Sequence, residues 1–243
     1  MIHKLTLQNI ISKYYLSGLI ESVKWSIKDE TLNIRFMLPT RDMIGELEFK
    51  GLKLANTELA IFNTSQLNKL IGITQGDLLL DIIKQGNIAN RLVIQDNQYT
   101  LTYALADTLL INKVGAVEEP SHANTTAILN NEQITALIKA KSALPDTNHI
   151  ILTDDTDFNG DSVINFVLGD NSEFSNKITY SIKSTVNSPL DLPFDADTFK
   201  EILSANKDAK SGELHIFDGG LMKLHFEYDN VLKTTYYLIR KQE

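Results

Sequence analysis

The sequence predicts an α+β fold made of two similar domains, each with two helices packed on antiparallel sheet. Three observations lead to this fold class. Apolar residues spaced at i, i+3, i+4 and i+7 mark four short amphipathic helices, and the segments between them have the character of strands. The order of helices and strands is the same in both halves of the chain, which indicates a duplicated domain.

The predicted helices lie near residues 5–15, 64–73, 131–142 and 197–207. In the first half, the predicted strands are 22–28, 31–38, 44–49, 57–62, 90–96 and 98–107. In the second half, they are 149–153, 162–168, 177–183, 184–192, 212–218, 221–229 and 232–241. Each half therefore has a helix, a set of strands, a second helix and a second set of strands.

The clearest match between the halves pairs "FNTSQLNKLIGIT" (62–74) with "FDADTFKEILSAN" (194–206). Each segment follows an apolar strand that ends in Phe, continues with residues that can cap a helix, and then carries an apolar triplet. We interpret the two segments as copies of one element.

Between the halves, residues 112–126 ("NKVGAVEEPSHANTT") are rich in Gly, Pro, Ser, Asn and Thr and show neither the helical nor the strand period. We expect a first domain at 1–111, a connector at 112–126 and a second domain at 127–243. A long surface loop within a single domain is the alternative, although loops of this length are uncommon in compact domains.

The composition limits the functions to consider. A hydrophobic content of 43% in 243 residues is enough for packed cores, and the apolar runs are too short to span a bilayer, so we expect a soluble, intracellular protein. The absence of cysteine excludes disulfides and cysteine nucleophiles. A formal net charge of −8 argues against a protein that holds nucleic acid through its overall charge.

The outer faces of the four helices are nevertheless poor in acids. Small polar residues and lysines dominate there, with Glu132 in a first turn and Glu201 as the only acid inside a helix. The lysines predicted on these faces are Lys13, Lys69, Lys139, Lys141, Lys200 and Lys207. This pattern suits a surface that stays near a polyanion without holding it firmly, although scattered exposed lysines are also common by chance.

With these features the chain resembles the sliding clamps, the processivity factors of DNA polymerases, and is most similar to the bacteriophage type with two clamp domains per subunit. The residues that carry the resemblance are the two matched helix segments, the stretch "YALADTLLI" (103–111) before the connector, and the ending "LHFEYDNVLKTTYYLIRKQE" (224–243).

The resemblance implies a non-enzymatic homotrimeric ring that encircles double-stranded DNA without sequence preference. It implies a replicative DNA polymerase and a clamp loader as partners, no cofactor, and action in the cytoplasm, that of a host cell if the protein is viral. The helix lysines would face phosphates, and a pocket for partner peptides would include Val114, Val117, Tyr237, Leu238 and Ile239.

Other motifs point elsewhere only weakly. The stretch 154–161 ("DDTDFNGD") resembles the start of a calcium loop, but Phe166 stands where the loop needs glutamate, so we interpret it as a hairpin turn. The five histidines lack metal-binding spacing, although His215 and His225 could be neighbours. Hydrolase, NTPase and dinucleotide motifs are absent from the sequence. A β-rich structural or virion assembly protein remains the alternative function.

Overall fold

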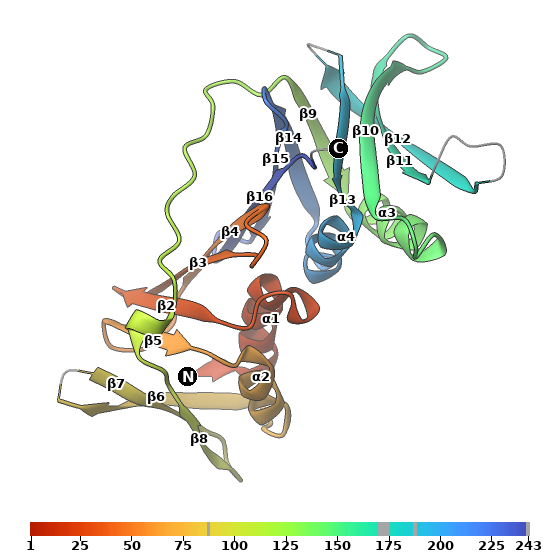
Figure 1. Cartoon of the computed structure of the whole chain (residues 1–243). Coiled ribbons are helices and arrows are strands. Elements are labelled where there is room, and N and C mark those ends of the chain that lie inside the picture. Colours follow the sequence, from red (N-terminus) through yellow and green to blue (C-terminus); the bar gives the residue numbers. More distant parts are fainter. Residues whose placement is uncertain (87, 170–174, 187–188, 242–243) are drawn as a thin grey trace. The chain divides into compact units, whose positions relative to one another are not determined.

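The computed structural model of the chain describes residues 1–86, 88–169, 175–186 and 189–241. These residues divide into two compact units. The first unit contains Met1–Ala116 and Asp229–Thr234, and the second contains Val117–Tyr228 and Thr235–Glu243. Each unit has its own helices and sheet strands and is described by itself (Figure 1).

The first unit has two helices, α1 (Lys4–Tyr15) and α2 (Thr64–Gly72). Its strands form two sets of hydrogen-bonded neighbours, in the orders β4-β3-β2-β5 and β1-β6-β7-β8. The strands are β1 (Ile2–His3), β2 (Val23–Lys28), β3 (Thr31–Met37), β4 (Met43–Lys50), β5 (Thr57–Ile61), β6 (Asp77–Gln85), β7 (Ile88–Gln95) and β8 (Thr100–Ala104). Two 3-10 turns, η1 (Leu16–Gly18) and η2 (Thr108–Leu110), follow α1 and β8.

The second unit has helices α3 (Asn131–Ala143) and α4 (Ala196–Ala205). Its strands are neighbours in the order β13-β10-β11-β12-β9-β14-β15-β16, and the Leu232–Thr234 part of β16 belongs to the first unit. The strands are β9 (Thr125–Asn130), β10 (His149–Thr156), β11 (Ser162–Gly169), β12 (Lys177–Val186), β13 (Asp191–Asp195), β14 (Ser211–Phe217), β15 (Leu221–Tyr228) and β16 (Leu232–Ile239).

The element order confirms the predicted α+β fold with an internal repeat. Each unit has one strand, a helix, four strands, a second helix and three strands. The matched helix segments begin in the same way: the Asn63 side chain accepts a hydrogen bond from the Gln66 N–H at 2.8 Å, and that of Asp195 accepts one from the Thr198 N–H at 2.8 Å. Both residues satisfy a backbone donor that the first turn of a helix leaves free.

The apolar spacing of the helices fixes which face is buried. In α1, Leu7, Ile10 and Ile11 are fully buried, and in α4 Ile202 and Leu203 are too. These residues recur every three or four positions and so form one stripe along the helix. The stripe is the side of each helix that packs into the core of its unit.

The strands that face the helices alternate as the sequence predicts. In β3, Leu32, Ile34 and Phe36 are buried while the residues between them are more exposed. Phe36 lies directly opposite Gly45 on β4, and a Cβ on that glycine would lie only 2.0 Å from the Phe36 ring. The glycine therefore makes room for the aromatic ring.

Sequence reasoning missed three strands and misplaced the ends of others. It missed β1, β6 and β9. β1 has only two residues. β6 begins with three leucines in a row, so its sequence does not alternate, although Leu78 and Leu80 are buried and Leu79 is exposed. The predicted strand 98–107 ends at Ala104, because Asp107 accepts a hydrogen bond from the Leu109 N–H and starts η2.

The prediction of a strand at 184–192 was also wrong. Its first residues continue β12 to Val186, Asp191 starts β13, and residues 187–188 lie outside the described part of the chain. The predicted connector 112–126 overlaps the first two residues of β9, which starts at Thr125, and the two units divide within it, between Ala116 and Val117.

The acidic stretch near residue 157 is a hairpin turn, as predicted. It joins the antiparallel strands β10 and β11. The Asp157 carboxylate accepts hydrogen bonds from the N–H groups of Asn159 and Asp161, each at 2.9 Å, and Gly160 supplies the positive φ of 84° that the turn needs. No helix among the described residues is long and apolar enough to cross a membrane.

Candidate nucleic-acid interface and partner surfaces

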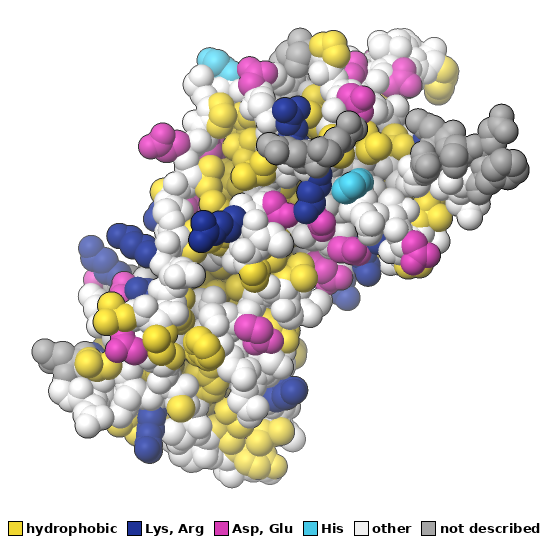
Figure 2. Space-filling model, viewed as in Figure 1, with side chains coloured by type: hydrophobic (Ala, Val, Ile, Leu, Met, Phe, Trp, Pro, Cys, Tyr) yellow, Lys and Arg dark blue, Asp and Glu magenta, His cyan; other side chains and the backbone are white. Residues whose placement is uncertain are grey.

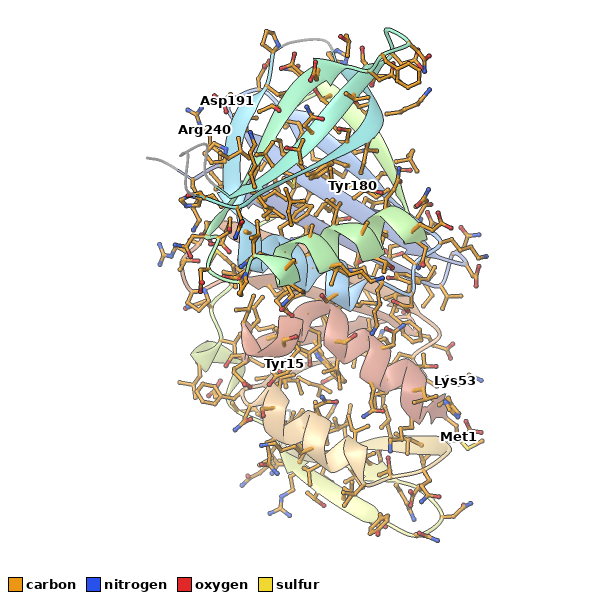
Figure 3. The ribbon with its side chains drawn as sticks, turned by 90° about the vertical axis from the view of Figure 1, so that its right-hand side faces the viewer. Met1, Tyr15, Lys53, Tyr180, Asp191 and Arg240 are labelled. Carbon is orange, nitrogen blue, oxygen red and sulfur yellow. The ribbon has the colours of Figure 1, made fainter. Side chains whose placement is uncertain are left out.

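The two helices of each unit lie side by side and leave one face of each helix uncovered by strands (Figure 3). Lys69 on α2, Lys139 on α3 and Lys207 just after α4 are exposed. Within the described residues these three lysines form no ion pair, so their charge is available to an anion. Their positions agree with the prediction, and DNA contact by them remains a prediction.

Lys200 on α4 is less available. Its side chain is 30% exposed, and its Nζ lies 3.7 Å from a carboxylate oxygen of Glu201. Because Glu201 is the acid next to it in sequence, the net charge that the pair presents is small. Both side chains of this pair are half-buried, at 30% and 22% exposed.

The prediction that Lys13 lies on the outer face was wrong, because the residue is fully buried. It follows Ile10 by three positions, which places it about 60° from that core residue around the helix at 3.6 residues per turn. Lys13 therefore lies at the border of the apolar stripe, and its long aliphatic stem packs there.

The same correction applies to Lys141, which is only 3% exposed. It follows Leu137 by four positions and shares its buried face. Its Nζ donates a hydrogen bond to the Pro145 carbonyl at 2.7 Å and lies 2.9 Å from a carboxylate oxygen of Asp197. Lys141 thus connects the end of α3 to the first turn of α4 and does not present its charge to solvent.

The residues expected to form a partner pocket are mostly covered. Tyr237 and Leu238 are 5% and 2% exposed, which contradicts the expectation that they supply accessible apolar atoms. Tyr237 and Leu238 are consecutive in β16, so their side chains lie on opposite faces of the sheet. Both are buried, so both faces are covered at this point. Val114 and Val117 are half-buried, and Ile239 is 51% exposed.

An acidic residue of the connector explains part of this burial. Glu119 accepts hydrogen bonds from the Tyr237 hydroxyl and from Lys223 Nζ, the latter at 2.8 Å. Burial alone would raise the pKa of the Glu119 carboxyl, but Lys223 and Tyr237 lower it below its usual range. The connector is therefore held on β15 and β16 by an ionised carboxylate.

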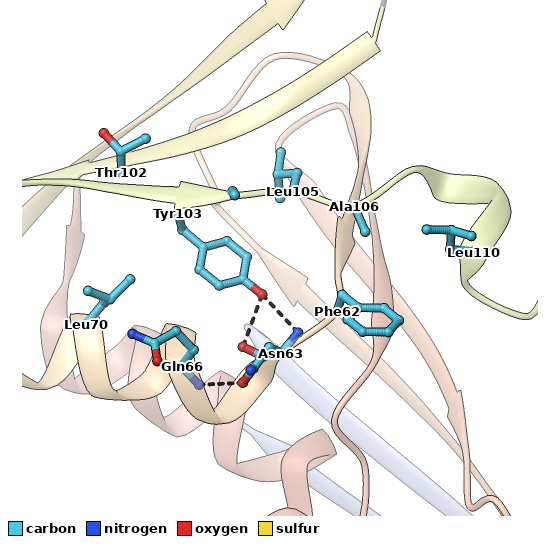
Figure 4. A pocket seen from close by; sticks show the side chains of 10 residues that line it. Phe62, Asn63, Gln66, Leu70, Thr102, Tyr103, Leu105, Ala106 and Leu110 are labelled. Atoms are coloured by element: carbon cyan, nitrogen blue, oxygen red, sulfur yellow. Dashed lines mark hydrogen bonds between the residues drawn. The ribbon is translucent and has the colours of Figure 1, made fainter.

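An apolar pocket that sequence reasoning did not find lies in the first unit (Figure 4). It has a volume of about 530 Å³ and lies between the start of α2, β8 and η2. Its lining includes Phe62, Leu70, Tyr103, Leu105 and Leu110. Figure 2 shows hydrophobic side chains gathered on the surface of this unit, over the region of β5 to β8.

The pocket lies where the two copies of the repeat differ in burial, a difference that the sequence does not show. Phe62 and Phe194 occupy matching positions, yet Phe62 is 55% exposed and Phe194 is fully buried. The Tyr103 hydroxyl donates to the Asn63 carbonyl and accepts from the Asn63 N–H, both at 3.0 Å, which fixes the pocket wall beside Phe62. The copies of the repeat thus bury this ring in the second unit and leave it accessible in the first.

The described residues contain no group of three or more His, Asp or Glu side chains that could hold a metal ion. His215 and His225 are not direct cross-strand neighbours: His215 lies opposite Lys223, and His225 opposite Glu213.

The chain has the fold of a sliding clamp, as a comparison with solved structures shows. Proliferating Cellular Nuclear Antigen from Entamoeba histolytica has a solved structure that matches with a TM-score of 0.74 at 15% sequence identity. The match covers 99% of this chain and 96% of that chain. No protein-family model and no curated protein matches the sequence. The fold is thus shared far beyond recognisable sequence similarity.

Proposed function

We propose that this protein is a DNA sliding clamp that encircles double-stranded DNA as a homotrimeric ring and tethers a replicative DNA polymerase. The observation that carries the proposal is the fold itself, because both repeated units together match a clamp structure over 99% of the chain. The protein performs no chemistry in this proposal and needs no cofactor.

The available lysines support a sliding contact with DNA. We propose that Lys69, Lys139, Lys200 and Lys207 face phosphates, and that the buried Lys13 and Lys141 do not. A topological ring needs only weak, sequence-independent attraction, because each strong phosphate contact releases counterions and resists movement. A few lysines in a chain of net charge −8 meet that requirement.

Partner binding is proposed to involve the connector and the end of β16. Of the predicted pocket residues, Ile239 is exposed and Val114 and Val117 are half-buried, so these three remain candidates for contacts with polymerase and clamp-loader peptides. We keep 1–111, 112–126 and 127–243 as the proposed first domain, connector and second domain. A bacteriophage origin and action in a host cytoplasm also remain predictions from the resemblance.

A retention assay tests the encircling of DNA. The protein is loaded on a closed circular plasmid by the cognate loader, or at high concentration without it, and the plasmid is then linearised. A clamp stays with the circle and slides off the linear form, whereas equal retention on both would contradict the proposal. Negative-stain electron microscopy of the purified protein should show rings with a hole wide enough for a duplex.

Paired charge reversals test the DNA-facing lysines. The variant Lys69→Glu with Lys207→Glu should reduce retention on the circle without changing assembly, because both side chains are exposed. The matched control is Lys28→Glu, which reverses an exposed lysine at the end of β2. An equal loss in the control would show that only the overall charge matters.

The fold match favours the clamp over the β-rich assembly protein that the sequence also allowed. Filaments or shells in the micrographs would reverse that preference.

A further inference from the structure

The connector is attached to the second unit by polar contacts at one point. Among the described residues of the chain, Glu119 is the only member of 112–123 with a hydrogen bond or an ion pair. The next hydrogen bond along the chain is at Asn124, whose N–H donates to the Ile216 carbonyl at 2.8 Å. From residue 112 to residue 123 the backbone forms neither helix nor strand. A single side chain therefore pins this segment to the sheet.

Donors from two strands hold the Glu119 carboxylate. Lys223 Nζ, on β15, lies 2.8 Å from each of its two oxygens. The Tyr237 hydroxyl, on β16, donates to one of them. An ionised carboxylate only accepts hydrogen bonds, and bonds to a charged group are stronger than bonds between neutral groups. Lys223 and Tyr237 thus form a carboxylate-binding site that the chain fills with its own residue.

A third strand contributes to the border of this site. His215 on β14 lies directly opposite Lys223, so the two side chains project from the same face of the sheet. Its Nε2 lies 3.3 Å from a carboxylate oxygen of Glu213. His215 is also among the groups that lower the pKa of the Glu119 carboxyl, after Lys223 and Tyr237. A protonated His215 therefore adds to the attraction that the site has for an anion.

The contact is accessible to a competitor. The Glu119 side chain is 37% exposed and that of Lys223 is 20% exposed, so water reaches both charges. Ion pairs that water reaches are weak. Pro120 follows Glu119 and disfavours the helical conformation for it, so the connector has little means of forming regular structure around the contact. An acid from another molecule can therefore replace Glu119 without unfolding any helix or strand.

We infer that Glu119 is a displaceable latch: an acidic side chain of a partner protein takes its place on Lys223 and Tyr237 and frees the connector. The ligand is the carboxylate of an Asp or Glu residue, because the site already holds that group. This inference rests on the proposed partner binding at the connector and names the chemistry of the contact. A partner that is bound elsewhere on the protein presents its acid at an effective concentration of about millimolar, which lets it compete with Glu119.

A spin label tests the latch, because the chain contains no cysteine and a single introduced one can be labelled. Ser121→Cys carries the label at an exposed position two residues after the latch, and the electron paramagnetic resonance spectrum reports its mobility. Adding Glu119→Gln or Lys223→Met should raise the mobile fraction severalfold. Glu118→Gln removes the neighbouring exposed acid and is the matched control, which should leave the spectrum unchanged. Identical spectra in all of these proteins would overturn the latch.

A peptide copied from the connector tests whether the site accepts an acid from another molecule. The peptide contains residues 112–124 ("NKVGAVEEPSHAN") and is added to the Glu119→Gln protein, which lacks its own carboxylate at the site. Its dissociation constant, measured by fluorescence anisotropy, should be about tenfold lower than that of the same peptide carrying Glu119→Gln. Equal dissociation constants would overturn the carboxylate-binding site. Wild-type protein should bind the peptide more weakly than the variant does, because its tethered Glu119 competes.

The plasmid retention assay separates this inference from the clamp proposal. Glu119→Gln changes none of the proposed DNA-facing lysines, so the variant should stay on closed circular DNA as wild type does. Normal retention together with an immobile connector in every variant would overturn the latch and leave the clamp proposal standing. Failure of wild type to stay on the circle would overturn the clamp proposal, while a mobile connector in Glu119→Gln would still support the latch.

Discussion

Lys4 and Asn131 are each the first residue of the first helix in their unit, and each donates a hydrogen bond to the chain at or just after the end of the second helix. Lys4 Nζ donates hydrogen bonds to the carbonyls of Gly72 and Thr74 at 2.7 and 2.6 Å, and Asn131 Nδ2 donates to the Lys207 carbonyl at 2.6 Å. The last carbonyls of a helix lack intrahelical partners and carry partial negative charge. The repeat therefore keeps a structural role while it changes the residue that performs it.

Removal of these caps should destabilise the protein. We expect Lys4→Met to lower the free energy of unfolding by roughly 1 to 2 kcal/mol and Asn131→Ala by about 1 kcal/mol, since each change leaves backbone carbonyls at or just after the end of the second helix without their donor. Urea denaturation followed by circular dichroism measures both losses. Thr6→Ala alters an exposed residue of α1 and serves as the control; a loss of equal size there would contradict the capping argument.

Two lysines of α3 should respond in opposite ways to charge reversal. Lys139→Glu changes an exposed side chain, so it should leave stability unchanged and weaken retention on circular DNA. Lys141→Glu places a carboxylate in a buried position beside Asp197 and should cost roughly 3 kcal/mol or more. Urea denaturation measures the free energy of unfolding of both variants, and the retention assay measures their hold on circular DNA. A stable Lys141→Glu protein with weakened DNA retention would show that Lys141 faces DNA after all.

The four helices were predictable because each apolar stripe is regular and begins at a recognisable cap. Asn63 and Asp195 could even be matched between the halves. The strands missed were those without alternation or length, such as β1 and β6.

The site was less predictable because the exposure of a side chain depends on its contacts with residues far away in the sequence, which no local pattern shows. Lys13 and Lys141 lie at the border of an apolar stripe, where a lysine can point outward or pack its stem inward. Tyr237 is covered by Glu119, more than a hundred positions away in sequence, and no local pattern predicts that contact. The pocket at Phe62 likewise joins α2 to β8 and η2.

The contact between Glu119 and its partners should lose its stabilising effect in acid. The pKa of Glu119 is lowered in the folded protein, so its contribution is complete above the unfolded value of about 4.3 and disappears as pH falls through the folded value. Wild type should therefore exceed Glu119→Gln in stability at pH 7, and the difference should shrink below about pH 4. Urea denaturation of both proteins between these pH values tests this, and a difference that does not change with pH would contradict it.

Glycine-to-alanine changes at two positions should have opposite effects. Gly45→Ala puts a methyl group within 2.0 Å of the Phe36 ring and should destabilise the first unit by about 1 to 3 kcal/mol, because the ring and strand must move. At Gly72, the last residue of α2, an added Cβ meets nothing within 4 Å. Gly72→Ala should therefore stabilise the protein by up to about 1 kcal/mol, since alanine favours the helix. Urea denaturation of the two variants supplies the comparison, and equal effects of the same sign would show that contact with Phe36 does not control the response at Gly45.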